Sequence, residues 1–286
     1  LVARGRSNTL VDLEAHRDLG ILDVIFPVLH GPYGEDGSVQ GLCRVAGIPC
    51  VGAGVLGSAV GMDKDVMKRL LRDAGIATAR FLAVGRAEPA PAFGVATAAL
   101  GVPLFVKPAN LGSSVGVRKA RTAGEFAEAL DLAFRYDTKA IVEEFVEGRE
   151  LECSVLGNDD PVASVPGEVL PSHEFYDYEA KYLDEHGAVP KIPAELDDTT
   201  TQRIRSLAVE CFKVLCCEGM ARVDSFLRPN SEMLLNEINT IPGFTKISMY
   251  PKLWDASGIP YGELVERLID LAIERQQRES KLQTTV

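Results

Sequence analysis

Two neighbouring segments near the end of the chain alternate apolar and polar side chains with the period of a β-strand. Residues 221–227 and 233–239 carry this alternation, and residues 228–231 between them read Arg-Pro-Asn-Ser, a composition typical of a turn. The pattern predicts a β-hairpin with one apolar face and one polar face.

The polar face of this predicted hairpin collects charged and amide side chains. Arg222 and Asp224 share one face of the first strand, and Glu237 and Asn239 share one face of the second. Adjacent carboxylates repel one another unless a cation lies between them, and a set of oxygen donors without thiol or imidazole suits Mg²⁺ better than Zn²⁺. We therefore predict a magnesium site that holds phosphates. A hairpin whose polar face meets only water is the alternative that this pattern leaves open.

Composition narrows the class of protein and the kind of partner. The 286 residues are 46% hydrophobic and 25% charged, as in a globular enzyme, and the net charge of -11 disfavours nucleic acid as a partner. The weakly polar stretch at 51–62 is too short to span a membrane. The six cysteines include no C-x-x-C pair and only four histidines are present, so we expect no zinc site, no disulfides and a cytoplasmic location.

Hydrophobic periodicity predicts alternating strands and helices. At the start of the chain we expect a buried strand at 22–29, a loop at 30–37, a helix at 38–46, a short strand at 48–51 and one amphipathic helix at 58–74. Further on we expect a strand at 104–107, a loop at 108–116, a helix capped by Thr122 that runs to about residue 136, and strands at 140–144 and 151–156. Residues 173–193 predict a long functional loop, and helices are expected at 198–218 and 262–278.

Residues 52–57 form a G-x-G-x-x-G sequence, which offers a dinucleotide-binding alternative. That function also requires a strand that ends in an acidic residue about 20 positions further on. Arg72 and Asp73 stand there, inside a predicted helix. We therefore expect a flexible connection between domains at 52–57, and an NAD-linked oxidoreductase would depend on this motif alone.

Three further features suit a nucleotide. Lys107 precedes a loop in which Gly112 and Gly116 flank two serines, so that backbone N–H groups are free to point at an anion. Lys64 begins a predicted helix, whose N-terminus attracts anions. Residues 143–150, Glu-Glu-Phe-Val-Glu-Gly-Arg-Glu, offer acceptors beside an aromatic ring, as a purine nucleotide requires. An ordinary Gly/Ser turn, a solvated lysine and a solvated acidic loop are the respective alternatives.

Taken together and in this order, the motifs of the chain resemble those of the ATP-grasp ligases and, within them, the D-alanine:D-alanine ligase family. The resemblance extends from about residue 22 to the C-terminus. It rests on 30–37 (His-Gly-Pro-Tyr-Gly-Glu-Asp-Gly), 62–64 (Met-Asp-Lys), 107–108 with 112–116, 175–182 (Phe-Tyr-Asp-Tyr-Glu-Ala-Lys-Tyr), 221–224 (Ala-Arg-Val-Asp) and 236–245 (Asn-Glu-Ile-Asn-Thr-Ile-Pro-Gly-Phe-Thr).

This resemblance implies an ATP-grasp fold of the α/β and α+β classes, with ATP held between two antiparallel sheets. The implied domains are an N-terminal α/β domain at 1–59, a central subdomain at 60–143 and a C-terminal subdomain at 144–286 that carries a lid loop at 173–193. The implied cofactors are ATP and two Mg²⁺ ions. Mn²⁺ can replace Mg²⁺ in this family, and a monovalent cation is a further possible ligand. The implied partner is D-alanine, in a homodimer without nucleic acid or membrane.

Family roles transfer to the matching positions. The implied metal ligands are Asp224, Glu237 and Asn239, and the implied nucleotide ligands are Lys64, Lys107, Ser113, Ser114, Glu143, Val146, Glu150 and Lys181. The implied substrate-binding residues are His30, Glu35, Arg222, Gly243 and Ser248, and the implied catalytic residues are Arg222, Gly243, Ser113 and Tyr182 of the lid.

The implied reaction joins two D-alanines through an acyl phosphate, for peptidoglycan synthesis and cell shape. Arg222 and the backbone N–H of Gly243 would stabilise the oxyanion, Ser248 would hold the carboxylate of the second substrate, and Tyr182→Phe would slow ligation without loss of the fold.

Two alternative functions are compatible with these motifs. A D-alanine:D-lactate ligase of the same family would carry a His in the lid, where residues 179–182 read Glu-Ala-Lys-Tyr and favour the dipeptide. A non-catalytic ATP-binding protein is suggested because the Glu that binds the first substrate's ammonium group in the family has no match in residues 1–21. The chain begins with Leu1 rather than Met, so we expect that residues are missing at its start.

Overall fold

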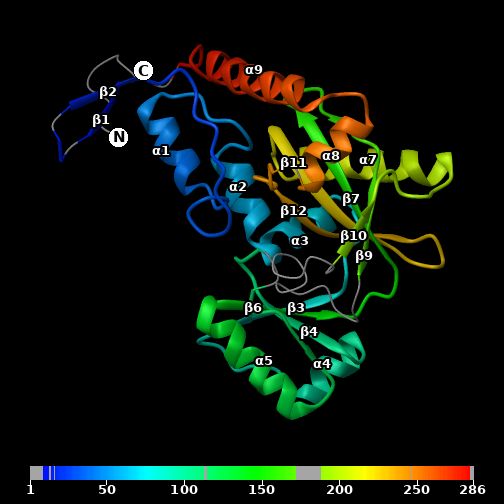
Figure 1. Cartoon of the computed structure of the whole chain (residues 1–286). Coiled ribbons are helices and arrows are strands. Elements are labelled where there is room, and N and C mark those ends of the chain that lie inside the picture. The colour runs from blue at the N-terminus through cyan, green and yellow to red at the C-terminus, as the bar shows by residue number, and fades with distance from the viewer. Residues whose placement is uncertain are drawn as a thin grey trace.

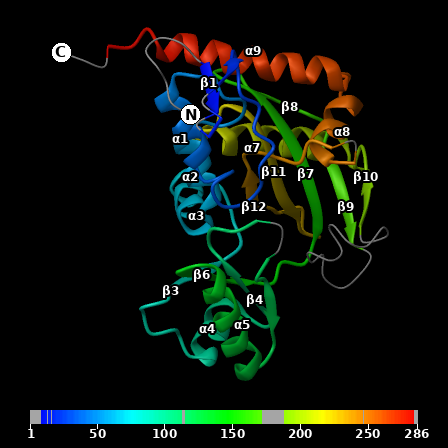
Figure 2. The ribbon, with the colours of Figure 1, turned by 60° about the vertical axis from the view of Figure 1, so that its left-hand side comes forward.

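The computed structural model describes residues 9–12, 14–15, 17–112, 115–171, 188–245 and 247–283. Within these residues, the strands form a six-stranded sheet, a four-stranded sheet and a two-stranded hairpin. The two larger sheets lie one above the other, in separate lobes of the molecule (Figure 1). The turned view in Figure 2 shows the same separation, with the chain crossing between the lobes near α3 and β3.

The larger sheet has the order β10-β9-β7-β11-β12, with β8 paired to β7, and every pair is antiparallel. Its strands are β7 (Arg149–Gly157), β8 (Val162–Ala163), β9 (Gly167–Pro171), β10 (Ala188–Lys191), β11 (Gly219–Leu227) and β12 (Met233–Asn239). The predicted hairpin is therefore confirmed as β11 and β12. In their register Arg222 lies opposite Asn239, and Asp224 lies opposite Glu237.

Different helices cover the two faces of this sheet. Apolar side chains of β7 and β11 pack with α3 (Lys64–Asp73) and α7 (Asp198–Val214), where Met67 and Phe212 are fully buried. On the opposite face α8 (Met249–Ala256) and α9 (Tyr261–Glu279) form a core that includes Tyr250 and Trp254. Because strand side chains alternate between faces, the polar residues of β11 point away from the α7 core.

The smaller sheet has the order β3-β6-β4-β5 and carries helices on the side that faces away from the larger sheet (Figures 1 and 2). Its elements are β3 (Phe81–Gly85), α4 (Phe93–Leu100), β4 (Leu104–Pro108), β5 (Arg118–Ala120), α5 (Ala123–Tyr136) and β6 (Lys139–Glu144). The predicted cap of α5 is confirmed, since Thr122 and Glu125 form a capping box. The other face of the sheet is thus left to face the larger sheet.

The N-terminal part differs most from expectation. It contains β1 (Thr9–Asp12), β2 (Arg17–Ile21), α1 (Ser38–Ala46) and α2 (Val55–Met62). The strand predicted at 22–29 is wrong, and so is the strand at 48–51: a single parallel bridge joins Ile25 to Cys50. Pro27 has no N–H to donate, and no strand among the described residues pairs along this segment.

The helix predicted at 58–74 is two helices, α2 and α3. They separate at Asp63, whose carboxylate accepts hydrogen bonds from the backbone N–H groups of Asp65 and Val66 and so caps α3. The flexible connection expected at 52–57 is also wrong, because Val51 and Ala53 are fully buried and Val55 begins α2. No strand–helix–strand unit surrounds this G-x-G-x-x-G sequence in the described residues, which removes the structural context that NAD binding needs.

The C-terminal elements follow the prediction with one omission. Helix α7 ends at Val214, earlier than expected, α9 matches the predicted closing helix, and α8 was not foreseen. Of the predicted lid loop at 173–193, residues 173–187 lie outside the described residues, and residues 188–191 form β10 instead of a loop. No helix within the described part of the chain has the length and apolar character that crossing a bilayer would demand.

Candidate active site

A cavity of about 460 Å³ lies between the two sheets. It takes side chains from both lobes: β4 and β6 from the smaller sheet, β7, β9, β11 and β12 from the larger sheet, and the start of α3. Among the predicted nucleotide ligands that the structure describes, those that line it are Lys64, Lys107, Glu143, Val146 and Glu150. Segments that are far apart in the sequence are thus brought together at one place.

One end of this cavity is apolar and flat. Phe105 and Phe145 stack with ring centroids 6.0 Å apart and an angle of 22° between their planes, and both line the cavity. Val146 and Val169 add buried apolar surface beside them. Glu150 also lines the cavity and supplies an acceptor. The ligand that would fit such a surface is an aromatic base linked to a group with hydroxyls. The base offers a flat apolar face to the rings, and the hydroxyls offer hydrogen-bond donors to a carboxylate.

A buried chain of charges lies deeper in the cavity. The Glu143 carboxylate binds the ammonium groups of Lys107 and Lys68, the latter at 2.8 Å. Burial by itself would raise the pKa of Glu143, but these two lysines outweigh it and lower the pKa. Burial also opposes the charge of Lys107, yet Glu143 and Glu237 raise the pKa of its ammonium group. Both groups therefore stay charged at neutral pH, with Lys107 beside the cavity as a cation for phosphate.

Lys64 connects α3 to the loop after β4. Its ammonium group donates to the Leu111 carbonyl at 2.6 Å and lies 3.4 Å from the Glu237 carboxylate. The prediction that Lys64 stands at a helix N-terminus is confirmed, since it is the first residue of α3. Lys64 and Lys107 therefore both line the cavity near Glu237, where an anion would meet two positive charges.

The polar face of β11 carries an ordered charge network. Arg222 donates from Nε and Nη2 to the two carboxylate oxygens of Asp224, both at 2.7 Å. Its Nε is also 3.0 Å from a carboxylate oxygen of Glu152 on β7, and Asn239 donates to Asp224 at 3.0 Å. Burial alone would lower the pKa of Arg222, but Asp224 and Glu152 raise it well above its ordinary value. The guanidinium is thus a permanent cation, held in place by two strands.

The predicted metal ligands fit a hard cation. Asp224, Glu237 and Asn239 meet in register on β11 and β12, and the Asp224 side chain is only 3% exposed. Within the described ranges no three His, Cys, Asp or Glu side chains cluster closely enough to hold a metal by themselves. Two carboxylates and one amide oxygen would leave positions for water and phosphate oxygens, which is how Mg²⁺ is usually bound.

Glu35 joins this region from the N-terminal part of the chain. It lines a small recess together with Lys64, Gly112, Glu237 and Asn239, and it accepts a hydrogen bond from the Gly31 backbone N–H at 2.7 Å. Burial raises the pKa of Glu35 even though the Gly31 N–H, His30 and Lys64 act in the opposite direction. The exposed His30 lies near enough to Glu35 to act on it electrostatically. Glu35 therefore borders the candidate site, and His30 lies close to Glu35.

Gly243 and Ser248 lie together after β12. A Cβ atom on Gly243 would come within 2.8 Å of the Ser248 hydroxyl, so the close approach depends on glycine. The Ser248 hydroxyl accepts from the Thr245 backbone N–H at 3.0 Å. The predicted residues Ser113, Ser114, Lys181 and Tyr182 lie outside the described residues, so their roles stay predictions.

Two residues of the network were missed by sequence reasoning. Lys68 lies four positions after Lys64, and this spacing places it on the same face of α3 as Lys64. Glu152 lies two positions after Glu150 on β7, and strand alternation puts both on one face. Helical and strand periodicity therefore carried a signal for both.

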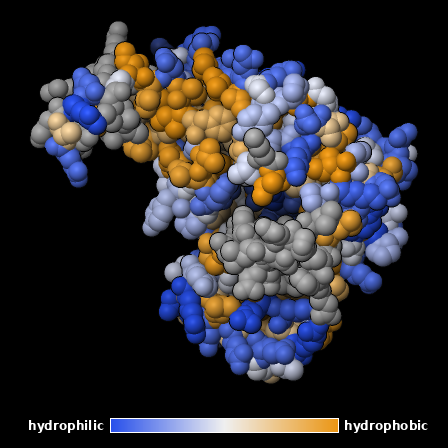
Figure 3. Space-filling model, viewed as in Figure 1, coloured by the Kyte–Doolittle hydropathy of each residue, from blue (hydrophilic) through white to orange (hydrophobic). Residues whose placement is uncertain are grey.

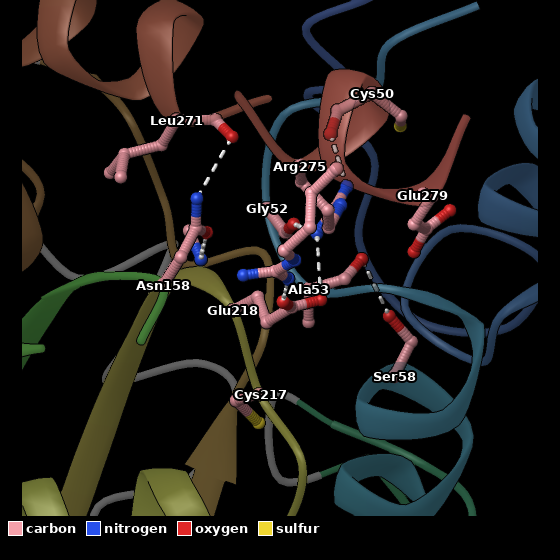
Figure 4. Close-up of polar contacts among 12 residues, drawn as sticks. Cys50, Gly52, Ala53, Ser58, Asn158, Cys217, Glu218, Leu271, Arg275 and Glu279 are labelled. Carbon is pink, nitrogen blue, oxygen red and sulfur yellow. Dashed lines mark hydrogen bonds and ion pairs between the residues drawn. The ribbon is translucent and has the colours of Figure 1, made fainter. Parts of the chain in front are cut away.

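A second cavity, of about 440 Å³, lies between the α1–α2 segment, the end of α7 and α9. Two of its charged groups, Arg275 and Glu218, are bonded to other protein groups (Figure 4). Arg275 donates to the backbone carbonyls of Cys50 and Gly52, both at 2.6 Å, and Glu218 forms an ion pair with Arg278. The Glu218 carboxylate also lies near Gly54, the residue before α2.

The fold and the site together define a class of protein. Two antiparallel sheets in separate lobes enclose a cavity that both lysines and carboxylates line, and a cavity so placed is what an ATP-grasp enzyme has for its nucleotide.

Comparisons with known proteins agree with this class and make it more specific. The model of the D-ala D-ala ligase N-terminus matches residues 3–53, and that of the D-ala D-ala ligase C-terminus matches residues 70–270. The D-alanine–D-alanine ligase of Oceanobacillus iheyensis is 52% identical over all 286 residues, which cover 78% of that protein. D-alanine–D-alanine ligase A of Escherichia coli is 53% identical over 97% of this chain and 76% of its own length. The chain belongs to the D-alanine–D-alanine ligase family.

Solved structures show the same relationship. The D-alanine-D-alanine ligase from Coxiella burnetii has a TM-score of 0.84 at 43% identity and covers 93% of this chain and 71% of that one. The VanG D-Ala:D-Ser ligase from Enterococcus faecalis has a TM-score of 0.82 at 40% identity, over 90% and 75% of the two chains. The Bacillus anthracis D-alanine–D-alanine ligase complexed with ATP has a TM-score of 0.77 at 30% identity, over 90% and 81%.

Proposed function

We propose that this chain joins two D-alanine molecules to D-alanyl-D-alanine, with conversion of ATP to ADP and phosphate, as a step that supplies peptidoglycan synthesis. The observation that carries the proposal is the cavity between the sheets, where Lys64 and Lys107 line the same space as Glu237 of β12. This arrangement suits a nucleotide with its phosphates next to the reacting carboxylate.

The nucleotide would lie with its base on the Phe105–Phe145 side of the cavity and its phosphates near the two lysines. Val146 would serve the base and Glu150 the ribose. The family role of Glu143 at the base stays a prediction, because its carboxylate binds Lys107 and Lys68. Asp224, Glu237 and Asn239 would hold Mg²⁺, or Mn²⁺ in its place, and the ions would neutralise phosphate charge. Ser113, Ser114 and Lys181 remain predicted phosphate ligands.

The first D-alanine is activated before the peptide bond forms. An oxygen of its carboxylate would attack the γ-phosphorus of ATP, so that the bond to the β–γ bridging oxygen breaks and ADP leaves. The free amine of the second D-alanine would then attack the acyl carbon, and inorganic phosphate would leave with the electron pair of the C–O bond. Phosphorylation is needed because an unmodified carboxylate would have to expel an oxide ion.

Arg222 is the proposed stabiliser of the oxyanion in the second step, together with the backbone N–H of Gly243. Its guanidinium is fixed by Asp224 and Glu152, so it needs little reorganisation when charge develops. His30 and Glu35 would bind the first substrate, and Ser248 the second. Tyr182 would close the site against water, and Tyr182→Phe would slow ligation.

A coupled ADP-release assay tests the proposal. We expect ADP only when D-alanine, ATP and a divalent cation are present together, and dipeptide in equal amount. L-alanine is the stereochemical control. D-lactate and D-serine are the competing nucleophiles, the latter because one structural relative is a D-Ala:D-Ser ligase. ADP release that is independent of D-alanine would contradict the proposal, and depsipeptide as the main product would favour the D-lactate rival.

We further propose a cytoplasmic homodimer. The cysteines are all free thiols, which suits a reducing compartment. Exposed apolar side chains, including Leu42, Val45 and Leu56, gather around α1 and the start of α2 (Figure 3). A patch of this kind suits a protein interface. Light scattering after size exclusion would measure the mass, and a monomer at micromolar concentration would contradict the dimer.

A further inference from the structure

Arg222 and the proposed metal compete for the same carboxylate. In this structure both oxygens of Asp224 accept from Arg222 at 2.7 Å, and one of them also accepts from the Asn239 amide. A cation that binds Asp224 needs at least one of these oxygens, and a cation and a guanidinium on the same oxygen repel each other. Binding of Mg²⁺ therefore requires Arg222 to give up part of its contact with Asp224.

Glu152 is the nearest alternative partner for Arg222. One of its carboxylate oxygens lies 3.0 Å from Arg222 Nε. Glu152 stands on β7 directly opposite Asp224 in the register of the sheet, so the guanidinium lies between two carboxylates on adjacent strands. The side chain of Glu152 is 7% exposed and that of Arg222 is 19% exposed, so water does little to weaken their attraction.

Without such a partner, release from Asp224 would leave Arg222 as a poorly solvated cation next to the metal. A buried charge that loses its partner is strongly destabilised. With Glu152 in place, the guanidinium keeps one carboxylate throughout and stays near the position proposed for the oxyanion.

We propose that Glu152 is a positioning residue that receives the Arg222 guanidinium when Asp224 turns an oxygen to the divalent cation. Glu152 would thereby set the metal affinity of the site and the position of Arg222 in the loaded enzyme. This inference rests on the proposed function for the identity of the metal ligands, but its test requires no turnover.

Mn²⁺ binding to the full chain with ADP, without D-alanine, measures the effect directly by electron paramagnetic resonance. Glu152→Gln should weaken Mn²⁺ binding about tenfold, the scale typical of residues that orient metal ligands. Glu152→Asp keeps the charge and should recover part of the affinity. The matched control is Glu218→Gln, which removes a carboxylate that pairs with Arg278 outside this cavity and should leave Mn²⁺ binding unchanged.

A double-mutant cycle separates positioning from a simple loss of negative charge. In an Arg222→Met background, Glu152→Gln should change the Mn²⁺ dissociation constant by less than about twofold, because the partner it positions is gone. Arg222→Met alone should tighten Mn²⁺ binding, and it tests the competition even if Glu152→Gln does not fold. Unchanged affinity in Glu152→Gln, or an equal loss in both backgrounds, would overturn the inference.

In steady state, Glu152→Gln should raise the Mg²⁺ concentration needed for half-maximal rate more than it lowers kcat. If the wild-type chain binds Mn²⁺–ADP but does not ligate D-alanine, the proposed function fails while this inference is still tested. If it ligates D-alanine and Glu152→Gln binds Mn²⁺ normally, only this inference fails.

Discussion

The two cavities of the described structure have nearly equal volumes, about 460 Å³ between the sheets and about 440 Å³ between α9 and the N-terminal segment. They differ in what their charged groups do. In the second cavity, Arg275 donates hydrogen bonds to backbone carbonyls, and Glu218 forms ion pairs with arginines. Between the sheets, Lys64, Lys107 and Glu237 converge from three elements and line the open space.

This difference separates charges that only join parts of the chain from charges that, although paired with protein groups, border a space that can hold a ligand. Arg275 of α9 fixes Cys50 and Gly52, which joins the N-terminal part of the chain to the C-terminal helix. Arg222 pairs with the carboxylates of Asp224 and Glu152, and Asp224 is a proposed metal ligand. Volume alone would not have told the two cavities apart.

The largest expected effect is on catalysis. Arg222→Met should lower kcat for D-alanine-dependent ADP release by about 10²- to 10³-fold, the usual effect of removing one oxyanion donor. The circular dichroism spectrum should stay native. Arg267→Met, at an exposed ion pair with Glu263, is the control and should keep its kcat. A threefold change in kcat corresponds to about 0.6 kcal/mol. If kcat of Arg222→Met stays within threefold of wild type, Arg222 has no large role in the reaction, and the proposed contrast between the two cavities fails.

Glu143→Gln should be the next largest change and should depend on pH. Its neighbours Lys107 and Lys68 lower the pKa of Glu143 from its ordinary value of 4.5, so its contribution to stability is full above pH 4.5 and is lost as the pH falls through the lowered pKa. At pH 7 the variant should lose about 3 kcal/mol of unfolding free energy, since two buried lysines lose their partner.

Urea unfolding of wild type and Glu143→Gln across pH 3 to 7 measures this dependence. The difference between them should shrink toward the acid end of the range. A constant difference would mean that folding does not lower the pKa of Glu143.

Arg275→Met should affect stability and spare catalysis. Two buried backbone carbonyls would lose a charged donor, and we expect a loss of about 2 kcal/mol of unfolding free energy. Thermal and urea unfolding would measure it. Turnover per folded molecule at low temperature should match wild type, and a large fall in kcat would show that the second cavity also serves the reaction.

Thr122→Ala should give the smallest change. It removes one half of the capping box of α5, in the smaller lobe and away from both cavities, and should cost about 1 kcal/mol. Hydrogen exchange of the first turn of α5 would locate the loss. If hydrogen exchange becomes faster to the same extent in β7 and β11, the stability of this helix end is not independent of the larger sheet.

Local rules predicted much of the fold. Alternation identified β11 and β12 and the face that carries Arg222 and Asp224, and the Thr122 cap placed the start of α5. The same rules wrongly predicted a strand at 22–29. An apolar run forms a strand only where a neighbouring strand completes its hydrogen bonds, and here a single bridge is formed. Asp63 interrupted a helical pattern that looked continuous, because its side chain competes for backbone N–H groups.

The site was predicted only in part, because its charges pair across elements. Sequence motifs pointed to Lys107 and Glu143 separately, but their contact and the contribution of Lys68 depend on how α3 lies against β6. Glu152 is likewise recognisable only once β7 is beside β11. The domain boundaries at 59/60 and 143/144, and the roles of residues 173–187, remain predictions.

A crystal structure with Mg²⁺ and a non-hydrolysable ATP analogue tests the central claim most directly. The account predicts the nucleotide between the sheets, with Lys107 near its phosphates and a cation on Asp224 and Glu237. It would be contradicted by a nucleotide bound in the cavity beside Arg275, or by an unchanged Arg222–Asp224 pair with no cation.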